Sequence, residues 1–134
     1  MSTSADATLT PVTGIALFDR WTALWNGDFS DPERFLDPGF RIRFGNDPER
    51  AQTDAIHGPA GIVEYITGFR AGHPGLRYAV DGTPLVDPAL GRAACCWYVT
   101  RPDGVQRSGI DLFEIVAGRI ATVWSVTGLR RFAD

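Results

Sequence analysis

The sequence predicts an α+β fold in which a curved, mostly antiparallel sheet packs against three helices from the N-terminal half. Apolar residues recur at helical spacing in most of the first half, whereas every segment after Gly75 alternates as strands do. One strand, residues 40–44, interrupts the helical half. Helices that close the concave face of such a sheet produce a cone with a cavity inside.

The first helix is expected over residues 15–26, where apolar side chains recur every three or four positions. A short second helix is expected over residues 31–36, because Asp31 can cap it and Pro32 suits its first turn. The Asp-Pro-Gly sequence at 37–39 then ends that helix.

Residues 40–44 alternate strictly and predict a first strand. A polar loop over 45–57 follows, and Gly58-Pro59 opens a third helix that runs to about Ala71. The buried stripe of this helix is expected to be Ile62, Tyr65, Ile66 and Phe69.

Four strands are expected in the second half, and they form a meander. Arg101-Pro102-Asp103-Gly104 has the composition of a tight hairpin turn. The register of this hairpin has two solutions, so the pattern leaves open whether Trp97 or Tyr98 faces the cavity. The strands span residues 76–86, 92–100, 105–116 and 119–129.

The chain has 134 residues, which suits a single domain over 13–134 behind a flexible leader of residues 1–12. All 13 basic residues are arginine, so the chain contains no lysine. This absence excludes Schiff-base chemistry and a lysine-containing phosphate loop.

Charge and apolar content argue against nucleic-acid and membrane partners. The net charge is −3 and the arginines are spread along the chain. No apolar run approaches the roughly 20 residues of a membrane span. Cys95 and Cys96 are neighbours on a strand and point to opposite faces, so we expect no disulfide and a cytoplasmic location.

The order of elements, together with three stretches, resembles the nuclear transport factor two-like superfamily, in its branch of SnoaL-like polyketide cyclases and ketosteroid isomerases. The stretches are residues 20–28, which end in Gly-Asp, residues 56–62, and residues 109–124 around the last hairpin. The resemblance implies a cystatin-like α+β barrel. It also implies isomerase, cyclase or lyase (dehydratase) chemistry without a cofactor, although this fold also serves non-catalytic proteins.

Asp111 is the strongest catalytic candidate. Strand alternation puts it on one face with Gly109, Phe113 and Ile115. Apolar surroundings raise the pKa of a carboxyl group, which lets it act as an acid near neutral pH. The resemblance aligns Asp111 with an aspartic acid that ketosteroid isomerases keep neutral in an apolar site, which is a known example of this effect. A structural Asp bonded to an Arg or a backbone amide is the alternative.

The chain departs from the relatives at other site positions. Arg43 matches the position of the isomerase base, and Arg20, beside Trp21, matches that of the catalytic tyrosine. Residues 122–125 lack the His and Asp that cyclases carry there. His57 is a candidate partner for Asp111, because imidazole titrates near neutral pH, although a loop His that bonds backbone is the more frequent case.

Aromatic content of 11% predicts a pocket for a small hydrophobic, ring-shaped ligand. Two separated histidines predict no metal site. Ile110 and Leu112, on the outer sheet face, predict a homodimer contact. The expected substrate-binding residues are Trp21, Arg43 if it points inward, Tyr65, Tyr78, Trp97, Phe113 and Ser125.

Three functional hypotheses follow. The first is a cofactor-free acid–base enzyme (cyclase, isomerase or dehydratase) that acts on a small hydrophobic, polyketide- or steroid-like molecule through Asp111. The second is an apolar-ligand-binding module without turnover. The third is a dimeric interaction module that uses the cone only as a scaffold. A closed apolar cavity lined by Asp111, with a second polar side chain within hydrogen-bond reach, favours the first, whereas a cavity filled by Trp and Phe side chains excludes the first two and leaves the third.

Overall fold

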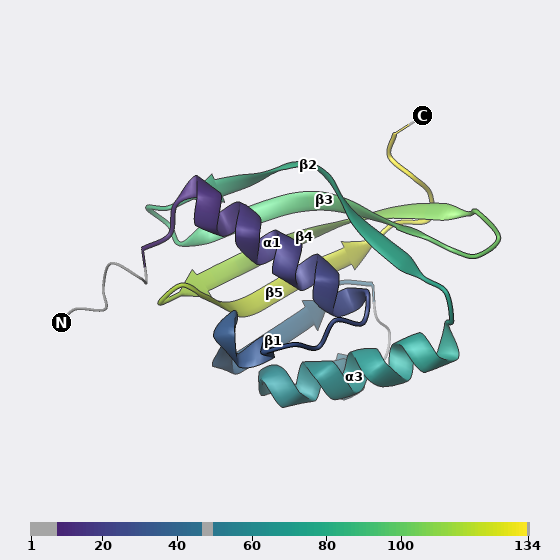
Figure 1. Cartoon of the computed structure of the whole chain (residues 1–134), viewed down its shortest axis with the longest axis horizontal. Helices are drawn as coiled ribbons and strands as arrows, with labels where there is room; N and C mark the ends of the chain where they lie inside the picture. Colours follow the sequence, from purple (N-terminus) through teal and green to yellow (C-terminus); the bar gives the residue numbers. More distant parts are fainter. Residues whose placement is uncertain (1–7, 47–49, 134) are drawn as a thin grey trace.

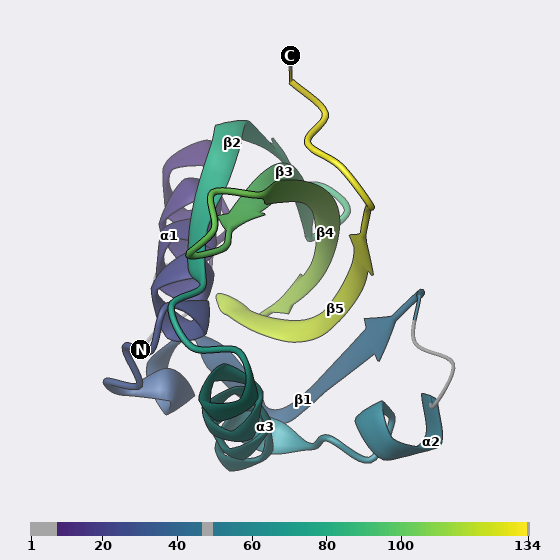
Figure 2. The same cartoon turned by 90° about the vertical axis from the view of Figure 1, so that its right-hand side faces the viewer.

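The computed structural model describes residues 8–46 and 50–133. Two long helices, α1 (Pro11–Trp25) and α3 (Gly58–Gly72), pack on a single five-stranded sheet of order β1-β5-β4-β3-β2. The sheet curls strongly, and α1 crosses its open side (Figure 1). Seen end-on, the strands curve round an interior that α1 closes on one side, while α3 lies beside β1 (Figure 2). The predicted α+β class and the curved sheet are confirmed.

Helix α1 begins earlier than the apolar spacing predicts. Thr10 and Thr13 form a capping box: the Thr10 hydroxyl accepts from the Thr13 amide at 3.1 Å, and the Thr13 hydroxyl accepts from the Thr10 amide at 2.8 Å. Pro11 then occupies the first helical turn, where its missing N–H leaves no bond unmade.

The predicted short helix is only one 3₁₀ turn, η2 (Pro32–Arg34), and strand β1 (Leu36–Phe44) starts well before the predicted strand. Asp37-Pro38-Gly39 does not end a helix. It lies inside β1, where the pairing with β5 shifts between Leu36 and Arg41. This irregularity accommodates the proline, which cannot donate to a sheet ladder. The predicted polar loop contains a short helix, α2 (Arg50–Thr53).

The meander is confirmed, with strand ends within two residues of those predicted. Its strands are β2 (Arg77–Asp87), β3 (Arg92–Thr100), β4 (Gln106–Val116) and β5 (Arg119–Thr127). Neighbouring strands of the meander pair antiparallel, and β1 pairs parallel to β5 at the sheet edge. The sheet is therefore mixed.

The hairpin turn decides the register that the sequence leaves open. Arg101 donates its amide to the Val105 carbonyl at 2.9 Å, and Gly104 adopts a φ of 87°, which glycine tolerates. Thr100 therefore pairs with Gln106, and Cys95 pairs with Asp111. Odd-numbered residues of β3 and β4 consequently share the concave face, so Trp97 points inward. Tyr98 lies on the outer face, where the Arg131 guanidinium is 3.6 Å from its ring centroid.

The core lies between the concave face and the helices. Phe40, Ile42, Phe113 and Val123 are fully buried there, as are Leu24, Ile62, Ile66 and Ile120 from other elements. The outer face carries exposed apolar side chains at Ile110, Trp124 and Val126. The homodimer contact through this face stays a prediction. No helix in the described part of the chain is long and apolar enough to cross a membrane.

Candidate functional site

A cavity of about 470 Å³ lies between the concave face of the sheet, α1 and α3. Aromatic rings form most of its wall, and polar side chains from α1, β5 and the segment after β1 complete it. The cavity is not filled by these rings. The lining residues are Phe18, Trp21, Thr22, Trp25, Phe44, Asn46, Gln52, Thr53, Tyr65, Phe69, Tyr78, Val80, Trp97, Asp111, Ser125 and Thr127.

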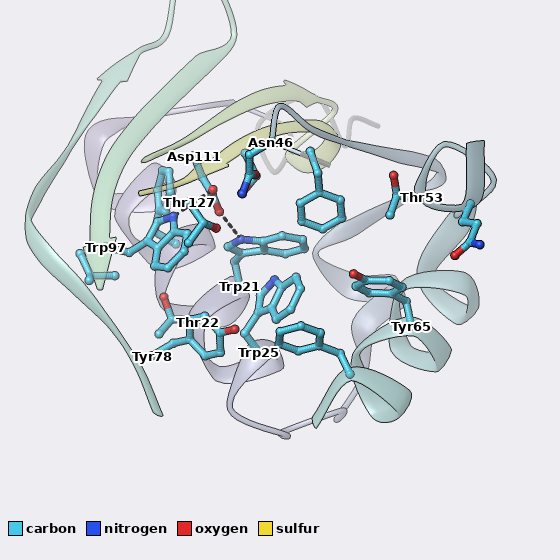
Figure 3. A pocket seen from close by; sticks show the side chains of 16 residues that line it. Trp21, Thr22, Trp25, Asn46, Thr53, Tyr65, Tyr78, Trp97, Asp111 and Thr127 are labelled. Carbon is cyan, nitrogen blue, oxygen red and sulfur yellow. Dashed lines mark hydrogen bonds between the residues drawn. The ribbon is translucent and has the colours of Figure 1, made fainter. Parts of the chain in front are cut away.

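Asp111 lies at the inner end of this cavity and is 4% exposed. Its Oδ2 accepts a hydrogen bond of 2.8 Å from Trp21 Nε1, and its Oδ1 accepts one of 2.9 Å from Trp97 Nε1. Figure 3 shows the two indole rings converging on the carboxyl group, with Tyr65 on the far side of the cavity. The carboxyl group is thus fixed from both sides by groups that can only donate.

The fold brings these two indoles together from distant parts of the chain. Trp21 belongs to the buried face of α1 and packs against Phe40 and Phe113, with ring centroids 5.7 and 5.9 Å apart. Trp97 lies across the backbone of its pairing partner Gly109. A Cβ at Gly109 would approach the Trp97 ring to 2.1 Å, so only glycine leaves room for this orientation.

Opposing effects act on the Asp111 carboxyl group. Burial raises its pKa above the ordinary value of 3.8, because desolvation penalises the charged form. Hydrogen bonds from Ser125, Trp21 and Trp97 work in the other direction, since they stabilise the carboxylate. Asp111 is also the only charged residue among the described residues of the cavity wall. No cation of the wall therefore commits the group to its ionised state.

Trp25 anchors the aromatic wall opposite the sheet. Its ring meets those of Tyr65 and Phe69 edge-on, with centroids 6.3 and 5.9 Å apart, and it packs at 5.5 Å against Tyr78. Edge-to-face pairs of this kind fix ring positions. The positions of the rings in this wall are therefore fixed by their mutual packing.

Tyr78 contributes a phenol that keeps its proton, because burial raises its pKa further above the ordinary value of 10.0. Its backbone is held by Asn26, the residue that ends α1. Asn26 Nδ2 donates to the Tyr78 carbonyl at 2.9 Å, and Asn26 Oδ1 accepts from the Tyr78 amide at 2.7 Å. This exchange ties β2 to the end of α1.

The structure brings most of the predicted site residues into one cavity. Trp21, Tyr65, Tyr78, Trp97, Asp111 and Ser125 all line it. Phe113 does not line it, because its ring is completely buried in the core and stacks on Phe18 at 3.9 Å.

Arg43 and His57 lie outside the cavity. Arg43 alternates with the inward-facing Ile42 and Phe44, so it points outward and pairs with Asp54 at 3.1 Å. His57 is exposed ahead of α3, where its backbone bridges to Arg41. Neither side chain is among those that surround Asp111.

Sequence reasoning missed several members of the wall. Trp25 stands one helical turn after Trp21, a spacing that indicates a shared face. Thr127 shares the inward alternation of Ser125 on β5. Asn46, Gln52 and Thr53 come from the segment between β1 and α3, for which no periodicity gives an orientation.

Two further observations concern possible metal ligands and the buried cysteine of β3. No group of three His, Cys, Asp or Glu side chains able to hold a metal ion occurs among them. Cys95 is buried opposite Asp111 in the ladder, and burial raises the pKa of its thiol to about 11. A thiol with that pKa stays protonated and unreactive at neutral pH.

The sequence model of the SnoaL-like domain matches residues 16–123, which is most of the chain and includes Trp21, Trp97 and Asp111. The chain belongs to the SnoaL-like domain family. No curated protein sequence matches it.

Solved structures similar to this SnoaL-like protein share its fold at low identity. One is a proposed isomerase of the SnoaL-like family from Agrobacterium tumefaciens, with a TM-score of 0.70, 22% identity, and coverage of 88% of this chain and 99% of that one. Another is a proposed SnoaL-like polyketide cyclase from Jannaschia, with a TM-score of 0.67, 17% identity, and coverage of 87% and 85%.

A third similar structure is a proposed ketosteroid isomerase from Kribbella flavida, with a TM-score of 0.66, 20% identity, and coverage of 91% of this chain and 82% of that one. At these identities the likeness establishes the fold of this SnoaL-like protein.

Proposed function

We propose that this SnoaL-like protein is a cofactor-independent acid–base enzyme that isomerises, cyclises or dehydrates a small hydrophobic carbonyl compound. One observation carries the proposal. A single carboxyl group, Asp111, is buried at the inner end of an open aromatic cavity and bonded by two indoles. Pairing of an apolar pocket with one polar group of perturbed pKa is characteristic of catalytic sites.

The geometry supports Asp111 as a group that gives and takes back one proton. In its neutral form it donates a hydrogen bond, then the proton, to the carbonyl oxygen of a substrate. The carboxylate that remains is stabilised by the Trp21 and Trp97 N–H groups, which already point at its oxygens. Taking a proton back from the reacting molecule restores the neutral carboxyl group, so no cofactor is consumed.

The cavity also narrows the reaction class. Besides Asp111, its described titratable groups are the phenols of Tyr65 and Tyr78, and Tyr78 keeps its proton. An acid that protonates the carbonyl oxygen, and whose carboxylate then removes a proton from the neighbouring carbon, produces an enol, and this step supports intramolecular aldol cyclisation or loss of water. The proposal therefore favours cyclisation and dehydration, and it assigns no role to His57 or Arg43.

The experiment that tests the proposal follows hydrogen–deuterium exchange at the carbon next to the carbonyl of 1-tetralone in D₂O by NMR. Acid activation of the carbonyl accelerates this exchange, and general acid–base groups typically contribute a factor of about 100 or more. We expect Asp111→Asn to lose the acceleration. Asp54→Asn, which removes a surface carboxylate paired with Arg43, serves as the matched control and keeps it.

Exchange unchanged in a folded Asp111→Asn protein would remove Asp111 from the mechanism. Trp97→Phe provides a second measurement, because loss of an indole donor raises the pKa of Asp111 further and moves the pH profile of exchange upward.

Binding without turnover is the second candidate, and the absence of a carboxylate or imidazole base beside Asp111 among the described wall residues favours it. In that case 1-tetralone quenches or enhances the fluorescence of Trp21 and Trp25, but the wild type does not accelerate exchange. Accelerated exchange that depends on Asp111 excludes this candidate.

A further inference from the structure

A second chamber of about 460 Å³ adjoins the cavity at the hairpin end of the sheet. Phe69, Tyr78, Trp97 and Thr127 line both chambers, so the two chambers are neighbours. The second chamber is completed by the end of α3 and the hairpin turn, through His73, Pro74, Leu76, Val99, Arg101, Pro102 and Arg107.

The two chambers differ in the ionisable groups of their walls. The described residues of the first include one acid and no cation, whereas those of the second include Arg101 and Arg107 and no acid. Arg101 is exposed and pairs with Asp103 at 3.2 Å in the turn. Arg107 forms no ion pair within the described part of the chain, and its buried Nε has no hydrogen-bond partner there.

Arg107 is half-buried in this concave wall, and a buried donor such as its Nε costs free energy until a partner satisfies it. Arg107 lies four residues before Asp111 on β4. Side chains an even number of residues apart on a strand point to the same face, so Arg107 faces inward as Asp111 does. At the rise of an extended strand, this spacing separates the two residues by about 13 Å. Such a distance suits the two ends of one elongated small molecule.

We propose that the two chambers form one bipartite site whose ligand carries a carboxylate that Arg107 binds. The apolar body with its carbonyl group lies in the first chamber, and the carboxylate lies in the second. The assignment of the carbonyl end rests on the function proposed above; the assignment of the anionic end does not. Arginine binds carboxylates in a bidentate manner, and the described wall of the first chamber contains no cation that could bind an anion.

The test uses a series of naphthyl ketones whose acyl chains end either in a carboxylate or in the neutral carboxamide of the same shape. Trp21, Trp25 and Trp97 line the cavity, so their fluorescence reports binding. We expect the wild type to bind the carboxylate about tenfold more tightly than the carboxamide, as a charge-assisted hydrogen-bonded pair predicts.

Arg107→Gln should abolish this preference, and Arg107→Lys should restore part of it. Arg119→Gln is the matched control, because it removes the same charge from an exposed position at the other end of the sheet and should leave the preference unchanged. Circular dichroism establishes that each variant is folded. Equal affinity of the wild type for the two compounds, or a preference that persists in Arg107→Gln, overturns the proposal.

The failure of this inference is distinguishable from the failure of the proposed function. Asp111→Asn should change ketone exchange while leaving the carboxylate preference intact, because Arg107 is unaffected. Loss of that preference in Asp111→Asn, with Arg107 unchanged, also counts against the bipartite site.

Discussion

Gly109→Ala is expected to displace Trp97 from Asp111, although the substitution changes no polar side chain. The added Cβ would lie 2.1, 2.4 and 2.6 Å from three atoms of the Trp97 ring. Ordinary contact begins at 3.4 Å, so the ring must retreat by about 1.3 Å. A donor that moves this far from its 2.9 Å position no longer bonds Asp111 Oδ1.

The expected cost combines two effects. Overpacking of a well-packed interior costs about 1–3 kcal/mol. Loss of one donor to a buried carboxyl costs about 1–3 kcal/mol more. Alanine also lowers the conformational entropy of the unfolded chain relative to glycine, which raises the free energy of unfolding by about 0.4–1 kcal/mol. The free energy of unfolding should therefore fall by roughly 1–6 kcal/mol, which lowers Tm by about 4–20 °C in a domain of this size.

Gly68→Ala is the matched control for this measurement. Gly68 lies inside α3, and a Cβ added there would meet no atom within 4 Å. Alanine at this position should raise the free energy of unfolding by about 0.5–1 kcal/mol through helix propensity. Urea unfolding and the near-ultraviolet dichroism of tryptophan measure both variants. A Gly109→Ala protein with wild-type stability and wild-type tryptophan dichroism would refute the packing of Trp97 on Gly109.

Three further predictions concern pH, strand anchoring and assembly. Burial raises the pKa of Asp111, so the folded state binds the carboxyl proton more tightly than the unfolded state does. This tighter binding contributes fully to the free energy of unfolding below the pKa of the unfolded state. The contribution is lost as the pH rises through the pKa of the folded state. The free energy of unfolding of the wild type, relative to that of Asp111→Asn, should therefore decline by at most about 1.4 kcal/mol per pH unit between these two pKa values. Urea titrations at several pH values measure this difference, and a difference that stays constant with pH contradicts the raised pKa of Asp111. Asn26→Ala removes both bonds to the Tyr78 backbone and should cost about 1–3 kcal/mol, with faster hydrogen exchange at the Tyr78 amide; unchanged protection would show that Asn26 does not anchor β2. If the outer face mediates a homodimer, Ile110→Glu should yield monomers in sedimentation velocity, whereas a monomeric wild type rejects that contact.

The fold was predictable because its strongest signals are local. Strand alternation and a hairpin turn with its own chemistry place β3, β4 and β5 to within two residues. The incorrect element boundaries occur where local sequence preference and pairing with a neighbouring strand favour different structures. Asp37-Pro38-Gly39 has the composition of a break, yet pairing with β5 keeps it inside β1 as an irregularity.

The site was predictable only in part, since its bonds connect segments that no local pattern relates. Alternation identifies Asp111, but the facing of Trp97 depends on one residue of hairpin register that composition does not determine. The Trp21 bond to Asp111 joins residues 90 positions apart. Arg107 was within reach of sequence reasoning, because it shares the alternation of Asp111.

The two indole bonds also imply an order of events in folding. The Trp97 bond spans 14 residues and can form as soon as the β3–β4 hairpin closes, whereas the Trp21 bond must wait until α1 docks on the sheet. Until then the Asp111 side chain lacks half of its cover. A meander that assembles before α1 arrives leaves Asp111 in contact with water, so the carboxyl group ionises more readily than in the folded protein. Docking of α1 then buries the group and raises its pKa, so acidic conditions should favour this later step of refolding.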